Sequence, residues 1–187
     1  MHCPFCHSPI HRNTPECGAC RLSYPRANVL LGAVPKMSLG VSDKTNSLRQ
    51  PELGKIRKRL SLLQNRFPGV TLQIVVHSFV PQHPFSLHAF WLFNAGNFSG
   101  DSKRGKDNRV LMLVLDPVRN ESAFVTGYAL EPFLQDGALG HLLELAGPSW
   151  ESGNWADGIQ LVIEGLGKLL ASVAIPIDPK AEKIGEF

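Results

Sequence analysis

The chain has 187 residues, 43% of them hydrophobic, which suffices for one globular domain with a small appendage but not for two full-sized domains. It has no run of about 18 apolar residues and no signal-peptide pattern at its N-terminus, so we expect a cytoplasmic protein without a membrane span. The net charge of +3 is uneven, because residues 1–68 hold 11 Lys/Arg against 3 Asp/Glu, whereas residues 69–187 hold 8 against 13. The basic first part could meet nucleic acid, an anionic surface or an acidic partner, or it could be a solvated helix face.

All four cysteines lie in the first twenty residues, as two Cys-x-x-Cys pairs separated by ten residues. Four thiolates on two tight turns suit tetrahedral Zn²⁺, and disulfides are disfavoured in a reducing cytoplasm. The spacing resembles that of short zinc ribbons at the N-termini of bacterial proteins. Because four thiolates complete the coordination, the site should be structural; free cysteines in a flexible tail are the alternative. We predict a zinc ribbon over residues 1–25 with the ligands Cys3, Cys6, Cys17 and Cys20.

Residues 26–50 carry scattered Ser, Gly, Pro, Asn and Thr without a sustained period, and they predict a linker. Its one apolar patch, residues 29–34, could be a short strand or a contact with the main domain. From Pro51 an amphipathic pattern predicts a helix that ends at Pro68-Gly69. The β-branched run over residues 70–79 then predicts a buried strand.

A second helix is predicted after Pro84, rich in aromatic residues and ending at Gly96. Residues 109–115 predict a strand buried on both faces, and residues 121–127 alternate as a return strand, so the pair should form an antiparallel hairpin. Two further helices are predicted, one after Asp136 and one from about Asn154 to Val173.

Helices before, between and after three clear strands favour an α/β fold, a three-layer α/β/α sandwich with a mixed sheet, over residues 51–175. Residues 176–187, with two prolines and alternating charges, should be a disordered tail.

Several short motifs, in order and spacing, resemble the TPM domain family over roughly residues 52–173. They are FWLFN, KDNRVLMLVLD, GYALEPFLQD and AGPSWESGNWADGI. The resemblance implies an α/β/α sandwich, acid phosphatase activity in some members, binding of calcium or other divalent metals, and assembly or repair of membrane complexes.

Four positions match the family pattern individually. Asp107 and Asn108 match its Asp-Asn before the central strand, Glu131 matches the Glu of its Gly-Tyr-Gly-Leu-Glu, and Asp136 matches the Asp that opens the next helix. The chain departs from the pattern at Arg109 and Ala129, where the family commonly has Gly. A less permissive backbone and an added positive charge would weaken a metal site.

The loop over residues 96–108 and the connection after residue 127 should leave the hairpin at one end, which we expect to be the C-terminal edge of the sheet. We predict a weak Ca²⁺ or Mg²⁺ site there, with the oxygen ligands Asp107, Asn108, Glu131 and Asp136. Two alternatives remain: the basic residues of the loop pair with these carboxylates, or Asp136 is only a helix N-cap.

The sequence has no Cys-x5-Arg loop outside the cysteine pairs and no phosphate-binding P-loop, so phosphate chemistry would need a carboxylate-bound metal. We therefore predict a binding or assembly module with an unknown protein partner. The alternative is a metal-dependent phosphatase that hydrolyses phosphate monoesters. A weaker alternative is nucleic-acid binding through residues 1–68, which lack the interleaved aromatic residues of a stacking surface.

Overall fold

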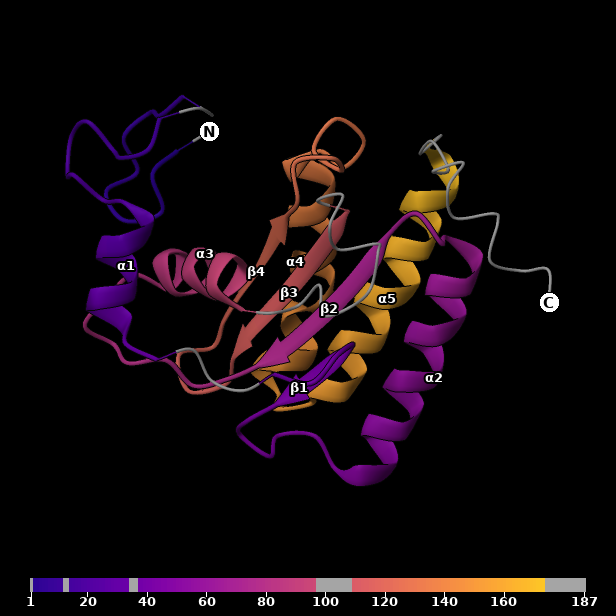
Figure 1. Ribbon diagram of the computed structural model, residues 1–187. Helices are drawn as coiled ribbons and strands as arrows, with labels where there is room; N and C mark the ends of the chain where they lie inside the picture. Colours follow the sequence, from indigo (N-terminus) through magenta and orange to yellow (C-terminus); the bar gives the residue numbers. More distant parts are fainter. Residues whose placement is uncertain (1, 12–13, 34–36, 97–108, 174–187) are drawn as a thin grey trace, which may run out of the picture.

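The sheet of the computed structural model has four strands in the order β1-β2-β3-β4 (Figure 1). β1 (Val41–Asp43), β2 (Thr71–Val76) and β3 (Val110–Asp116) are parallel, and β4 (Glu121–Thr126) returns antiparallel to β3. The predicted mixed sheet and its hairpin are confirmed. The structure describes residues 2–11, 14–33, 37–96 and 109–173.

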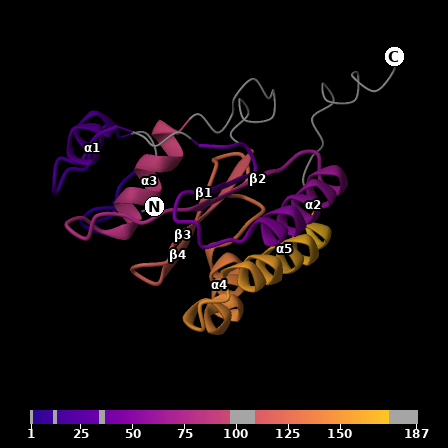
Figure 2. The same cartoon turned by 90° about the horizontal axis from the view of Figure 1, so that it is seen from below.

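Five helices of these residues cover the two faces of the sheet (Figure 2). One face carries α2 (Gln50–Arg66), α4 (Asp136–Glu151) and α5 (Trp155–Ser172). The other carries α3 (Phe85–Ala95), against which α1 (Tyr24–Leu31) packs. The predicted three-layer α/β/α sandwich is therefore confirmed. None of the described helices combines the length and the apolar character needed to cross a membrane.

The layers follow from the alternation of side chains along the two central strands. Ile74 and Leu113 face the cluster of α2, α4 and α5. Val75 and Val114 face the cluster that α3 forms with the N-terminal segment, residues 2–11 and 14–33. Every residue of β3 is buried, as expected for a strand covered by helices on both sides.

Strand β1 is an edge strand that the sequence did not predict, and it lies with most of α1 in the segment 26–50 that reads as a linker. Gln73 of β2, which is only 1% exposed, holds the chain before β1 against the sheet. The amide Oε1 of Gln73 accepts the N–H of Gly40 at 2.7 Å, and Nε2 donates to the carbonyl of Ser38 at 2.8 Å. A buried polar side chain thus binds the chain just before β1 to the sheet.

The N-terminal segment is attached to α3 by polar contacts as well as by apolar packing. The Ser86 hydroxyl donates to the carbonyl of Pro4 at 2.6 Å, and the Trp91 indole N–H donates to the side chain of Asn28 at 2.9 Å. Cys3 and Cys17 are buried in the same cluster as Leu87 of α3. The segment is therefore an integral part of this face of the molecule.

Candidate functional site

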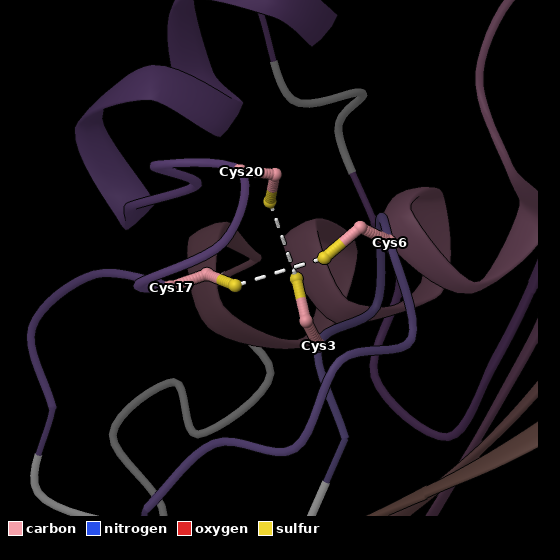
Figure 3. Close-up of side chains that lie close together, drawn as sticks. All are labelled: Cys3, Cys6, Cys17 and Cys20. Atoms are coloured by element: carbon pink, nitrogen blue, oxygen red, sulfur yellow. Dashed lines mark hydrogen bonds between the residues drawn. The ribbon is translucent and has the colours of Figure 1, made fainter.

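The four cysteine sulfurs converge into one cluster between two turns (Figure 3). All four Sγ atoms lie within 4.8 Å of one another, and the pairs Cys3–Cys20 and Cys6–Cys17 are each 3.7 Å apart. These separations exceed the ~2.05 Å of a disulfide bond. The cluster could hold a metal ion, and among the described residues it is the one group of three or more Cys, His, Asp or Glu side chains with this proximity.

The two Cys-x-x-Cys turns have the same backbone geometry. In the first, the N–H of His7 donates to the carbonyl of Cys3, and in the second the N–H of Arg21 donates to the carbonyl of Cys17. His7 and Arg21 both adopt the left-handed conformation, with φ of 58° and 59°. A short antiparallel bridge flanks each turn, His2 with Pro9 and Glu16 with Ser23. The site is thus built from two equivalent halves, each of which presents two thiols.

The acidities of the thiols are perturbed in opposite directions. Hydrogen bonds from Ser8, first from its side chain and then from its backbone, lower the pKa of Cys6 to about 6. Burial raises the pKa of Cys20 to about 12, although a hydrogen bond from the backbone of Leu22 favours its thiolate. One thiolate among close neighbours makes the next more difficult to form. A divalent cation would remove this conflict, because it attracts all four thiolates.

A groove of about 830 Å³ separates the N-terminal segment from the edge strand β4. Pro4, Ile10 and His11 line one wall, and Phe124 and Thr126 of β4 line the other. We call this the composite groove, because neither wall forms it alone. The connection after β4 closes its end with Tyr128, Glu131 and Asp136.

The outer edge of β4 borders the composite groove. Gly127 donates its N–H to the carbonyl of Val110 at 2.8 Å, which fixes the hydrogen-bonding phase of the β3–β4 ladder. In an antiparallel ladder the residues between hydrogen-bonded pairs direct their peptide groups outwards. The peptide groups of Ser122, Phe124 and Thr126 therefore point away from β3, to a side on which no other strand of the described chain lies.

The carboxylates predicted to bind a cation are only partly described. Asp107 and Asn108, with the rest of the loop over residues 97–108, lie outside the described residues. Glu131 and Asp136 line the composite groove together. Asp136 is the first residue of α4 and not its N-cap, which is Gln135 without a side-chain cap. The predicted site with Asp107 and Asn108 thus stays a prediction.

The position expected for that site needs a correction. Arg109 precedes β3 and Gly127 follows β4, so both connections do meet at one end of the hairpin. This end is where the parallel strands β1, β2 and β3 begin, because Thr71 pairs with Val110. The prediction of the C-terminal edge was wrong because a hairpin alone does not show which way the neighbouring parallel strands run.

The carboxyl edge of the parallel strands holds polar side chains that sequence reasoning did not single out. Asp116, fully buried at the end of β3, accepts the N–H groups of Phe79, Val118 and Arg119. At the end of β2, burial lowers the pKa of His77, against an opposing effect of Asp116, and its Nδ1 has no partner in the described structure. Asp116 thus holds two loops together, and only the spacing Asp-Pro-x-Arg before the return strand could have indicated this.

Comparison with solved structures supports the fold. The N-terminal domain of a protein from P. gingivalis is 24% identical, covers 71% of this chain and 82% of its own, and has a TM-score of 0.54. The N-terminal domain of the cg2496 protein from Corynebacterium glutamicum is 14% identical, covers 79% of this chain and 91% of its own, and has a TM-score of 0.55. The BA42 protein from the psychrophilic bacterium Bizionia argentinensis is 12% identical, covers 73% of this chain and 92% of its own, and has a TM-score of 0.59.

No curated protein matches this chain in sequence. The family model of the TPM domain matches residues 41–169, from β1 into α5. The match includes the edge strand β1 and helices on both faces of the sheet, α2 to α5, but not α1. It spans more than half of the chain, and the chain therefore belongs to the TPM domain family.

Proposed function

We propose that this chain is a cytoplasmic protein-binding module in which a structural zinc ion orders the N-terminal segment and a partner binds in the composite groove. The observation that carries the proposal is the joint construction of this groove from the N-terminal segment and the edge strand β4. A partner in it would touch both parts of the chain at once. The zinc ion then has a clear role, because it keeps one wall of the groove in place.

The cysteine geometry supports zinc as the metal. Four thiolates at the Zn–S distance of about 2.3 Å form a tetrahedron whose sulfurs are about 3.8 Å apart. Two of the observed separations are 3.7 Å, close to this edge length. Four thiolates leave no coordination position for substrate, so the ion would be structural. A reducing cytoplasm would keep the thiols available for the metal.

The open edge of β4 supports an extended peptide as the ligand. Outward-facing peptide groups on an edge strand can pair with one more strand, and pockets beside the strand then select its side chains. Phe124 and Tyr128 offer apolar surface beside this edge, and Glu131 and Asp136 add negative charge at its end. A partner segment with alternating apolar residues and a basic residue would fit both features.

The replacement Ser122→Pro tests the proposed addition of a strand to β4, on the same outer edge as Phe124 and Thr126, which line the groove. The N–H of Ser122 points away from β3, so proline removes a donor that strand addition needs while the β3–β4 ladder survives. The zinc-loaded full chain should retain partners from native extract that Ser122→Pro loses and that the control Ser122→Ala keeps. The binding of the identified partner, measured by calorimetry, should show the same order. Equal binding by all three proteins would contradict strand addition.

A phosphatase assay tests the opposing enzymatic role. The zinc-loaded protein should not hydrolyse a chromogenic phosphate ester beyond background, with or without Mg²⁺, Mn²⁺ or Ca²⁺. Turnover that copurifies with the protein and disappears in Asp136→Ala, while the thermal unfolding of that variant is unchanged, would replace the binding proposal with the metal-dependent phosphatase.

A further inference from the structure

A second groove, of about 870 Å³, is lined by α2 and α5. These two helices lie side by side on the face of the sheet opposite the N-terminal segment (Figure 2). We call this second groove the helix groove. Both helices line it at helical spacing, α2 from Lys55 to Arg66 and α5 from Gln160 to Ala171. At a rise of 1.5 Å per residue, the lining from Lys55 to Arg66 is roughly 17 Å long. This length matches about three turns of a third helix lying between the two.

The floor of the helix groove is apolar and open. Leu63 and Ile163 form its base and are buried, whereas Leu62 stands at its side with 61% of its surface exposed. Gly167 leaves space in the floor because it has no side chain, and a Cβ there would lie 3.4 Å from the Leu63 Cδ1. An exposed leucine beside a recessed apolar floor is typical of a surface that receives another apolar side chain.

The rim of the helix groove is strongly basic. Of the described residues that line it, five are basic and one, Glu164, is acidic. The Glu164 carboxylate is 2.9 Å from Lys168 Nζ, so this acid is already paired along α5. The remaining basic residues are Lys55, Lys58, Arg59 and Arg66, all on α2. The groove therefore combines an apolar floor with a net positive rim.

We infer that the helix groove is a docking site for an acidic amphipathic helix of a partner protein. The apolar stripe of such a helix fills the floor, and its flanking Glu and Asp residues meet the α2 rim. A flat anionic bilayer would contact the rim but not the recessed Leu63 and Ile163. Nucleic acid would likewise use the charges and leave the apolar floor uncovered. This site lies apart from the composite groove and does not depend on the function proposed above.

The test uses the zinc-loaded full chain and a labelled synthetic peptide of about 18 residues, long enough to form a helix. The peptide has leucine at helical spacing and glutamate at most other positions, and binding is followed by fluorescence anisotropy. A control peptide carries lysine in place of every glutamate. The acidic peptide should bind and the basic peptide should not, because the rim attracts one and repels the other.

Two pairs of variants locate the binding on the surface. Lys58→Glu changes the rim, whereas Arg57→Glu makes the same charge change on the same exposed helix outside the groove. Leu62→Glu places a charge on the exposed leucine at the side of the groove floor. Its control, Leu161→Glu, changes another exposed leucine, which does not line the groove. Each groove variant should weaken peptide binding about tenfold, and each control should change it less than about twofold. All four proteins are first compared by thermal unfolding.

Equal loss of affinity in the groove variants and their controls would overturn the inference, because binding would then follow net charge alone. Two other ligands are tested in parallel, namely vesicles of phosphatidylglycerol with phosphatidylcholine and a short single-stranded DNA. If either binds more tightly than the acidic peptide and loses affinity with Lys58→Glu, the occupant is a bilayer or a nucleic acid and the inference is wrong.

Discussion

Gly158, near the start of α5, lies directly against Trp150 of α4. A Cβ at this position would overlap the rigid indole of Trp150 at Nε1. Gly158→Ala should therefore destabilise the protein, although alanine is the better helix former. Gly54 in α2 is the matched control, because nothing lies within 4 Å of its Cβ position. Gly54→Ala should stabilise by about 1 kcal/mol. Urea denaturation measures both, and stabilisation by both changes would contradict this packing.

Two histidines, His77 directly after β2 and His88 in the first turns of α3, predict a dependence of stability on pH. Burial lowers the pKa of His88, which is 3% exposed and stacks on Phe79, and burial likewise lowers that of His77. A histidine with a lowered folded pKa takes up its proton first in the unfolded state. The free energy of unfolding should thus be constant above about pH 6.5 and fall as the pH decreases below it.

The charges that face His88 make the variant test specific. Arg119 and His83 oppose its protonation, whereas the Val80 carbonyl and Asp116 favour it. His88→Phe removes the titrating group, so the variant should lose less stability than the unchanged protein when the pH falls from about 7 to about 5. These two values lie on either side of the ordinary histidine pKa of about 6.5. An identical pH profile in chemical denaturation would show that His88 does not contribute.

At the residue scale, the cluster of cysteines could be predicted because the spacing of two Cys-x-x-Cys pairs is itself a metal-binding pattern. The four cysteines converge as two Cys-x-x-Cys turns require. Gln73 and Asp116 were missed, because a single polar residue in or after an apolar strand has no period and gains its role only from backbone groups distant in sequence. Glu131 and Asp136 were predicted in one site and do line one groove, but the N-terminal segment that lines its other wall was not predicted there, because no local pattern shows where that segment packs.

At the scale of the elements, removal of the proposed zinc ion should separate the N-terminal segment from the sandwich. The cluster around Cys3 and Cys17 covers part of α3, and the described hydrogen bonds between this segment and α3 are few: Ser86 with Pro4, Trp91 with Asn28, and Tyr24 with the Asn94 carbonyl at 3.5 Å. Chelation should therefore remove amide protection from hydrogen exchange at Cys3 and Cys17, while Leu113 of β3 stays protected. Loss of protection throughout the sheet would instead make the metal essential for the whole fold.

The helices and the hairpin were predictable because their periods are long and regular. The predicted helix after Pro84 matches α3, and the last predicted helix matches α5 within one residue at each end. β1 was missed because three residues are too few to show alternation. α1 was missed because it has eight residues and a single buried one, Ala27, so its apolar face carries little signal.

At the scale of the whole molecule, the three layers could be predicted from the sequence, but the direction of the parallel strands could not. The nearly continuous apolar runs of β2 and β3 require helices on both faces of the sheet, and the structure has them. The loop before β3 joins the sheet at the end where the parallel strands begin, and this follows from the parallel pairing of β2 with β3. Such pairing joins residues far apart in sequence and has no local signature.

The arrangement of Gln73 and β1 has a consequence for how the chain reaches its native state. β3 and β4 are joined by a tight turn with Asn120 at a φ of 52°, so this hairpin closes a short loop, whereas β1 needs β2 already in place before Gln73 can bind residues 38 and 40. Short loops close at a smaller entropic cost than long ones. The strand that leaves the ribosome first should thus be among the last to acquire stable pairing. In pulse-labelled hydrogen exchange during refolding, the amide of Val114 should become protected before the amide of Ile74, which donates to the carbonyl of Gly40. Simultaneous protection of the two amides would indicate a single cooperative step.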